Sequence, residues 1–336
     1  MKIPKIEKTP NGQYYCRLRI GGQSVSVYGA TEKECREQAT LIKAKHKAGE
    51  LEEKHGGLTL SKAIDQYIAD RENVLSPSTI RGYRGIQRNR FKSAMGRGLD
   101  AVNWQQVINN EAAICSAKTL HNAWGLIASV LKDNGLPVPG VRLPQVVQHE
   151  MPWLDPEQIP VFMEAVKGEP IELAALLGLH GLRASEIYGL TWDNIDLRHG
   201  TFRVSGAVVQ DVENKFVSKE TNKNSASRRT VPIMIPRLAE LLKQRQGSEL
   251  FTDYPGTFSR KVKRVCERSG LPPVSAHGLR HSFASLAYHL GMSERECMRL
   301  GGWADNQTMK KIYTHLYEKD AAKAANKMAD FYKNAK

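Results

Sequence analysis

Four short clusters in the second half of the sequence hold residue types that bind phosphate and transfer protons. The first is Gly181-Leu-Arg183-Ala-Ser-Glu186, which follows an apolar stretch. Arg183 and Glu186 are three residues apart, so on a helix they share one face and the carboxylate can orient the guanidinium. An arginine at the edge of a core needs a charged partner or an anion. By itself this cluster is explained most simply by a structural ion pair.

The second cluster is the polar run from Lys215 to Pro232, whose pattern predicts two strands joined by a flexible turn. A lysine at the tip of such a hairpin can reach a bound phosphate and donate a proton. The run contains Lys215, Lys219 and Lys223, and residue type alone does not choose among them. A solvated turn without chemistry is the simpler alternative.

The third cluster is His277-Gly-Leu-Arg280-His281. On a helix His277 and Arg280 face the same way; the histidine can exchange a proton near neutral pH and the arginine is a permanent anion ligand. His277 and His281 have the spacing of a zinc-binding helix, but Gly278 stands where that motif has its glutamate. We therefore expect no metal and no other cofactor, and His281 alone is interpreted as a structural histidine.

The fourth cluster runs from Leu300-Gly-Gly-Trp303 to Tyr313-Thr-His315. Tyr313 lies in a polar, basic stretch, where nearby cations favour ionisation of a phenol and so its use as a nucleophile. For a single tyrosine, however, a half-buried ring with a solvated hydroxyl is the more ordinary explanation.

The elements that must position these clusters are mainly helices, with small β elements. Segment 1–57 is predicted to contain strands at Gln13–Ile20 and Gln23–Tyr28 and a helix from Thr31 to about Ala48. Segment 58–145 reads as all helix, including one that begins at Ser76 with Pro77 at its first position. Proline and glycine residues over 136–150 predict a linker. Helices at 156–166 and 171–179, two short strand regions at 194–205 and 215–235, and further helices after 255 complete the chain.

Composition limits the class of protein. The 336 residues contain 49 Lys and Arg against 35 Asp and Glu, a formal net charge of +14, and all three segments are basic. Such a balance indicates a polyanionic partner, most often nucleic acid. The five cysteines are scattered without a CxxC pair, which favours free thiols in a reducing compartment. Neither a membrane span nor a signal peptide is expected, so we expect a soluble intracellular protein.

The order of the clusters is more specific than any one of them. Arg, Lys, His-x-x-Arg, Trp and Tyr follow one another, in the motifs GLRASEI, HGLRHSFAS, LGGW and IYTH. The chain resembles the tyrosine recombinase (phage-type integrase) family. In this resemblance Tyr313 is the nucleophile, Arg183 and Arg280 hold the non-bridging oxygens of the scissile phosphate, and His277 hydrogen-bonds that phosphate and assists proton transfer.

The same resemblance assigns the remaining site residues. Lys223 is implied as general acid for the leaving 5′ oxygen, because it precedes Pro232 by nine residues, the family's usual offset. Trp303 stands where many members have histidine, and Glu186 supports the arginines. Ten residues separate Trp303 from Tyr313, one more than is usual, so either Trp303 or Gly302 occupies the family's position.

The resemblance also implies three domains. Residues 1–57 would be an arm-type DNA-binding domain with a three-stranded sheet and a helix, 58–145 a helical core-binding (SAM-like) domain, and 150–336 a mixed α+β catalytic domain with a C-terminal tail. That tail resembles an amphipathic helix, which packs on a neighbouring protomer or closes its own domain. The DNA contacts are then expected from five arginines: Arg17, Arg19, Arg81, Arg84 and Arg88.

The implied function is site-specific recombination by an integrase of a phage or integrative element in the cytoplasm of a bacterial host. Double-stranded DNA with core and arm attachment sites would be cut through a 3′-phosphotyrosine and a Holliday junction by a homo-tetramer. An excisionase and a DNA-bending protein are possible partners. The alternatives are an inactive sequence-specific DNA-binding regulator and a type IB-like topoisomerase or resolvase with the same chemistry. A basic RNA-binding protein explains the charge but not the ordered motifs.

Overall fold

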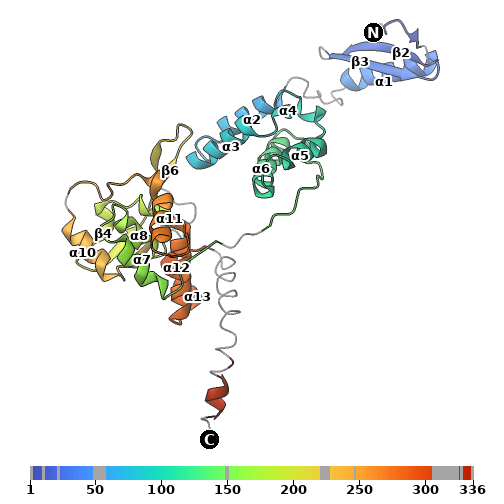
Figure 1. The fold of residues 1–336 in the computed structure, drawn as a ribbon. Coiled ribbons are helices and arrows are strands. Elements are labelled where there is room, and N and C mark those ends of the chain that lie inside the picture. The colour runs from blue at the N-terminus through green and yellow to red at the C-terminus, as the bar shows by residue number, and fades with distance from the viewer. Residues whose placement is uncertain are drawn as a thin grey trace. The chain divides into compact units, whose positions relative to one another are not determined.

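The computed structural model describes residues 3–9, 12–20, 23–47, 58–147, 151–219, 228–245, 247–304, 325 and 328–333 (Figure 1). Two of the predicted site residues, Lys223 and Tyr313, lie outside these ranges, as does the side chain of Arg19. The chain divides into two compact units, residues 1–147 and 148–336, and each is described by itself.

The first unit begins with a small antiparallel sheet and a helix. Its strands are β1 (Glu7–Lys8), β2 (Tyr14–Ile20) and β3 (Gln23–Gly29), in the order β1-β2-β3, and α1 spans Glu32–Lys47. Alternate residues of β2 enter the core, where Cys16 and Leu18 pack with Val27, Cys35 and Ala39. The predicted sheet and helix are confirmed.

Arg17 lies on the opposite side of β2 from this core. It is exposed and stands opposite Ser26 in the register of β2 with β3. Next to that pair, the rings of Tyr15 and Tyr28 stack with centroids 6.0 Å apart. The outer face of the sheet therefore presents Arg17 beside two aromatic rings.

The rest of the first unit is helical, as predicted: α2 (Leu60–Ala69), α3 (Pro77–Asn89), α4 (Lys92–Met95), α5 (Trp104–Ala112) and α6 (Ala117–Asp133). Side chains of Thr59, Asn103 and Ser116 accept backbone N–H groups at the starts of α2, α5 and α6. These helices share one apolar core that includes Leu60, Ile64, Phe91, Trp104 and Ile127.

Helix α3 has no buried residue, and it carries three of the arginines predicted to contact DNA. Arg81 and Arg88 are exposed. Arg84 instead forms an ion pair with Asp65 and donates a hydrogen bond of 2.8 Å to Gln87. Arg84 is thus held against α2, which leaves the exposed Arg81 and Arg88 as the more accessible cations of this helix.

The compact part of the second unit is built on the helices α7 (Gln158–Val166), α8 (Glu172–Gly178), α9 (Ala184–Ile187), α10 (Pro236–Gln244), α11 (Phe258–Arg268), α12 (Ala276–His289) and α13 (Glu294–Gly301). The predicted apolar helix at 171–179 is α8, every residue of which is buried. Helices α7, α9, α10 and α12 all pack against it (Figure 1). This arrangement places the end of α8, and with it Gly181 and Arg183, against α12.

The strands of the second unit lie in the two predicted regions, apart from β6, but their pairing differs from the prediction. One sheet has the order β4-β5-β8, with β4 at Ile195–Asp196, β5 at Thr201–Val204 and β8 at Arg229–Pro232; β6 (Ala207–Gln210) pairs with β7 (Phe216–Lys219). The expected hairpin between the two halves of 215–232 is therefore wrong, because β7 and β8 pair with different strands. The physical reason is burial: Phe202 of β5 lies opposite Val231 of β8, and both are fully buried in the core.

Outside the two compact cores, residues 328–333 are helical and expose Met328 and Phe331. The remaining part of the predicted C-terminal helix lies outside the described residues. No described helix has the length and apolar character needed to cross a membrane.

Candidate active site

Arg280 is the most deeply buried charged side chain of the second unit's described residues. It lies on α12, and its side chain is 1% exposed. Its Nη1 donates to the carbonyl oxygens of Gly181 and Gly301, each at 2.5 Å. Its Nε and Nη2 are buried without a hydrogen-bond partner among the described groups. Burial of two donors without partners lowers the stability of the folded protein, and a bound anion would provide acceptors for them.

Trp303 covers the face of this guanidinium. The guanidinium carbon of Arg280 lies 3.8 Å from the centroid of the indole ring, and the Phe283 ring stacks on the indole at 6.3 Å and 12°. Trp303 therefore fixes the plane of Arg280, a role that its place in the sequence does not indicate. Its predicted place in the catalytic set, where many members of the family have histidine, stays a prediction.

Arg183 lies at the start of α9, just after α8. Its Nη1 donates to Oε1 of Glu186 at 2.6 Å, and its Nη2 donates to the carbonyl oxygen of Gly302 at 3.2 Å. Its side chain is 36% exposed, whereas that of Glu186 is 3% exposed. The spacing of these two residues predicted the contact, and the structure places the guanidinium at the surface with its carboxylate behind it.

Arg229 belongs to the same cluster, and the sequence reasoning missed it. The side chain is 5% exposed, its Nη2 lies 3.0 Å from Oε2 of Glu186, and its Nε donates to the carbonyl oxygen of Leu300 at 2.7 Å. A signal was present: in a strand over 229–232, Arg229 shares a face with the apolar Val231 and so must point inward. The run 215–232 also contains three lysines that can donate a proton, and the prediction considered these lysines and not Arg229.

Two glycines with positive φ shape the backbone that these arginines contact. Gly181, at φ +84°, ends the turn after α8, and Gly302, at φ +72°, ends α13. Side chains rarely adopt this conformation. A Cβ on Gly302 would also collide with the guanidinium of Arg229. Both carbonyl groups accept from an arginine, so the turns serve to orient the cations.

The charges of the cluster do not cancel. Burial alone would raise the pKa of the Glu186 carboxyl, but the charges and hydrogen bonds of Arg229 and Arg183 outweigh burial, and the pKa is lowered. Burial lowers the pKa of Arg280 to about 9, with Arg183 adding to the effect. At neutral pH three positive arginines therefore surround one negative carboxylate, and the excess positive charge favours an anion.

His277 lies in the first turn of α12 and is exposed. Partial burial of its ring lowers its pKa, and the charges of Arg280 and Arg183 lower it further. Its ring meets that of His281 edge to face at 4.8 Å, and burial lowers the pKa of His281 to about 4. The lowered pKa favours the neutral form of the imidazole, and a negative charge nearby would favour the protonated form.

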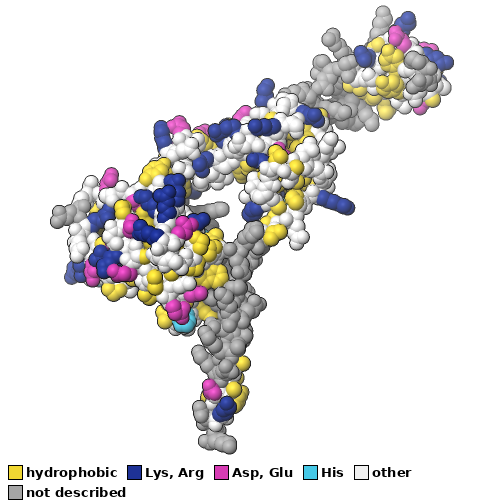
Figure 2. Space-filling view, viewed as in Figure 1, with side chains coloured by type: hydrophobic (Ala, Val, Ile, Leu, Met, Phe, Trp, Pro, Cys, Tyr) yellow, Lys and Arg dark blue, Asp and Glu magenta, His cyan; other side chains and the backbone are white. Residues whose placement is uncertain are grey.

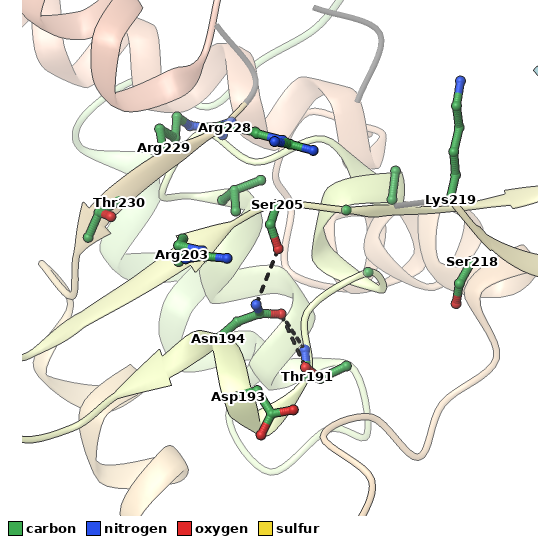
Figure 3. Close-up of a pocket in the computed structure, with 14 residues that line it drawn as sticks. Thr191, Asp193, Asn194, Arg203, Ser205, Ser218, Lys219, Arg228, Arg229 and Thr230 are labelled. Atoms are coloured by element: carbon green, nitrogen blue, oxygen red, sulfur yellow. Dashed lines mark hydrogen bonds between the residues drawn. The ribbon is translucent and has the colours of Figure 1, made fainter. Parts of the chain in front are cut away.

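A pocket of about 900 Å³ adjoins the cluster and includes Arg229 in its wall (Figure 3). Arg203, Lys219 and Arg228 also line it, together with Asn194 and Ser205, whose side chains are hydrogen-bonded to each other. Lys219 and Arg228 bound the stretch 220–227 that contains Lys223. On the face of the second unit shown in Figure 2, Lys and Arg side chains form a dense cluster.

The structure therefore brings Arg183, Glu186, Arg280 and Trp303 together, with His277 on the same helix as Arg280. It does not test Lys223 or Tyr313. Arg17, Arg81, Arg84 and Arg88 belong to the other compact unit. Fixed donors with an excess of positive charge can bind a phosphodiester and stabilise the charge that develops on its oxygens during transfer.

Comparison with known proteins agrees with this chemistry. The model of the phage integrase family matches residues 152–320. A tyrosine recombinase XerC-like protein of Caldanaerobacter subterraneus subsp. tengcongensis is 26% identical over 218 residues, covering 55% of this chain and 56% of that protein. The ICEBs1 integrase of Bacillus subtilis is 26% identical over 223 residues, covering 60% of each chain. The chain thus spans less than two thirds of the length of these two curated relatives.

Among solved structures, the Tn1549 transposon integrase in complex with transposon right-end DNA has a similar fold. The TM-score is 0.64 at 17% identity, and the match covers 81% of this chain and 99% of that one. A mainly helical fold with small sheets is therefore shared with a known integrase.

Proposed function

Since the chain belongs to the phage integrase family, we propose that it is a site-specific DNA recombinase of a phage or other mobile element. It cuts and rejoins DNA strands through a covalent bond between a tyrosine and the DNA. The observation that carries this proposal is Arg280, buried with two unused donors beside the exposed guanidinium of Arg183. A purely structural ion pair would not leave two buried guanidinium donors without partners.

In the proposed reaction the phenolic oxygen of Tyr313 attacks the phosphorus of one DNA strand. The bond from phosphorus to Tyr313 forms while the bond to the 5′ oxygen breaks, which leaves a 3′-phosphotyrosine. Lys223 gives the leaving oxygen its proton, so a free 5′ hydroxyl is produced. The energy of the broken phosphodiester is retained in the new ester, so no nucleotide cofactor is consumed.

The arginines act on the pentacoordinate transition state. Negative charge builds on its non-bridging oxygens, where Nε and Nη2 of Arg280 and the outer edge of Arg183 donate. The carbonyl groups and Trp303 already fix Arg280, so little reorganisation is needed as charge develops. The phosphate raises the lowered pKa of His277 when it binds, which lets the imidazole accept the proton that the phenol loses.

Rejoining reverses these steps with a new strand. A 5′ hydroxyl from the partner duplex attacks the phosphotyrosine, the phosphodiester forms again and the tyrosine is released. Two successive pairs of exchanges pass through a Holliday junction. Four active sites are needed, so the proposed assembly is a homo-tetramer on two duplexes. An excisionase and a DNA-bending protein remain proposed partners, and the cytoplasm of a bacterial host the proposed location.

The remainder of the chain receives DNA-binding roles in this proposal. Residues 1–57 form an arm-binding domain, 58–145 a core-binding domain and 150–336 the catalytic domain. The outer face of the first sheet, where Arg17 is exposed, suits entry into a major groove, and Arg19 is proposed to act with it. The exposed Arg81 and Arg88 are proposed to contact phosphates, with Arg84 held between them.

A covalent-trapping assay tests the proposed function. The protein is incubated in EDTA with nicked duplexes of randomised sequence, quenched with SDS and separated on a denaturing gel. A nick near the cleavage point lets the short 5′-hydroxyl fragment diffuse away and traps the adduct. A shifted, protease-sensitive band supports the proposal, and sequencing of the trapped DNA gives the preferred site. DNA binding without any band favours an inactive DNA-binding regulator.

A second readout separates the recombinase from a topoisomerase of the same chemistry. Duplexes selected in the trapping assay are offered in pairs, with one member labelled. Exchange of the label between duplexes supports strand transfer to a partner, whereas relaxation of supercoiled plasmid alone indicates a type IB-like activity. Binding should also weaken steeply with salt, because phosphate contacts release counterions.

A further inference from the structure

Arg229 is a buried cation that the proposed reaction does not use. It is the first residue of β8, directly after the stretch 220–227 that carries Lys223. Its Nε donates to the carbonyl oxygen of Leu300 near the end of α13, and Trp303 and Tyr313 follow this helix in the sequence. Arg229 therefore links the strand that follows the Lys223 stretch to the end of the helix that precedes Tyr313 in the sequence.

Arg229 shares one partner with Arg183, the Glu186 carboxylate, and binds the backbone close to the other. Oε1 of Glu186 accepts from the Arg183 guanidinium at 2.6 Å. Oε2 of the same carboxylate lies 3.0 Å from Nη2 of Arg229 and accepts the Arg183 backbone N–H at 3.1 Å. The second partner of the Arg183 guanidinium is the carbonyl oxygen of Gly302, two residues after the carbonyl that Arg229 binds.

The positive charge of Arg229 balances the negative charge of the Glu186 carboxylate. Without Arg229, the buried Glu186 carboxylate would keep Arg183 as its nearest cation, with Nη1 of Arg280 at 4.0 Å as the next. In a site of low dielectric, the unneutralised carboxylate would attract both guanidinium groups. Arg183 is the more exposed of the two and so the freer to move. Each would then be turned toward Glu186 and away from an incoming phosphate.

We propose that Arg229 is a positioning residue for strand cleavage: it neutralises Glu186 and fixes the turn after α13, so that Arg183 and Arg280 stay directed at the scissile phosphate. This inference rests on the proposed recombinase function. It assigns Arg229 no contact with DNA. Its loss therefore slows the chemical step while the affinity for DNA is retained.

The test compares Arg229→Gln with the wild-type protein on a nicked duplex selected by trapping. Two quantities are measured: the single-turnover rate of adduct formation at saturating protein, and the Kd from gel shift. The expected result is a rate lower by about 100-fold, the loss that a misplacement of about 1 Å can cause, with an unchanged Kd. Arg198→Gln is the matched control, since it removes the same charge from an exposed side chain and should leave the rate unchanged.

Two further variants distinguish positioning from a general loss of structure. Arg229→Lys keeps the charge next to Glu186, so it should recover most of the rate. Arg229→Gln introduced into a Glu186→Gln protein should cost much less than it does in the wild type, because there is no carboxylate left to neutralise. A merely structural role predicts neither result.

Several outcomes would overturn the inference. These are equal rates for Arg229→Gln and wild type, additive effects of the two Gln substitutions, or a thermal unfolding midpoint that falls with the rate and is not restored by Lys. In each case the wild-type adduct still forms, so the proposed function stands. Absence of the adduct in the wild-type protein would overturn the proposed function, and the inference with it.

Discussion

The Arg280 guanidinium lies flat against the indole of Trp303, with 3.8 Å between the guanidinium carbon and the ring centroid. One face of the cation is thereby shielded from water, and its donors are confined to one plane. Its Nη1 donates to two backbone carbonyl groups, while Nε and Nη2 have no partner among the described groups. The relationship explains how a rigid cation can be held ready for an anion inside a protein core.

Two substitutions of Trp303 distinguish the contribution of its ring from that of its indole N–H. A desolvated cation–π contact is worth about 2 kcal/mol, or roughly 30-fold in rate. We expect Trp303→Ala to lose that much in the single-turnover rate of adduct formation, and Trp303→Phe to lose only a few-fold because the stacking face remains. If Trp303→Phe is as slow as Trp303→Ala, the indole N–H rather than the ring carries the effect.

The turn at Gly302 should be intolerant of any side chain. Gly302→Ala places a methyl group at φ +72° and against the Arg229 guanidinium, so we expect lost stability and adduct formation reduced by at least tenfold. Gly200→Ala is the matched control: its φ is +62°, but nothing lies within 4 Å of the added Cβ. The free energy of unfolding of the control, measured with urea, should fall by about 1 kcal/mol, and its cleavage rate should not change. Equal rates for the two variants would contradict the role assigned to the turn.

Stability should fall on acidification because of His180. Burial lowers its pKa to about 4, its Nε2 accepts the Met234 N–H at 2.9 Å, and its Nδ1 therefore donates to the Leu176 carbonyl oxygen at 2.8 Å. Below about pH 6.5 the unfolded chain binds a proton that the folded protein excludes. The free energy of unfolding thus decreases by up to about 1.4 kcal/mol per pH unit between pH 6.5 and 4.

Urea unfolding at pH 7, 6 and 5 measures this slope. His281, whose pKa is lowered in the same direction, adds to it. The variant His180→Gln should be less stable at pH 7 but less sensitive to pH, whereas a Gln at the exposed His289 should leave the slope unchanged. A His180→Gln protein with the wild-type slope would show that His180 is not responsible.

The sequence and the structure agree where local patterns decide the outcome. The buried α8, the strands β2 and β3 and the pair Arg183–Glu186 all follow from periodicity or from spacing of three residues. The pairing of β8 with β5 did not, because it depends on a contact between Phe202 and Val231 that are far apart in the chain. The face that Arg229 shares with Val231 indicates that it points inward, but its partners Glu186 and Leu300 are brought to it only by folding.

Other features of the site lie between these extremes. The residue types at 183, 277 and 280 suit an anion site, but their phosphate-binding roles come from the resemblance of the ordered motifs to the tyrosine recombinase family. Nothing in the sequence indicates that Trp303 stacks on Arg280, since stacking depends on where α13 ends relative to α12. The choice of Lys223 over Lys219 still rests on an offset in sequence.

The most direct test of the account is the covalent adduct in Tyr313→Phe. Wild-type protein and variant are incubated with the same nicked, selected duplex, and adducts are resolved on an SDS gel and digested for mass spectrometry. We predict that the wild type yields a DNA-linked peptide containing Tyr313. The variant, which lacks a single oxygen atom, should bind the duplex with the same Kd and yield no adduct. An adduct formed by Tyr313→Phe at the wild-type rate would contradict the central claim.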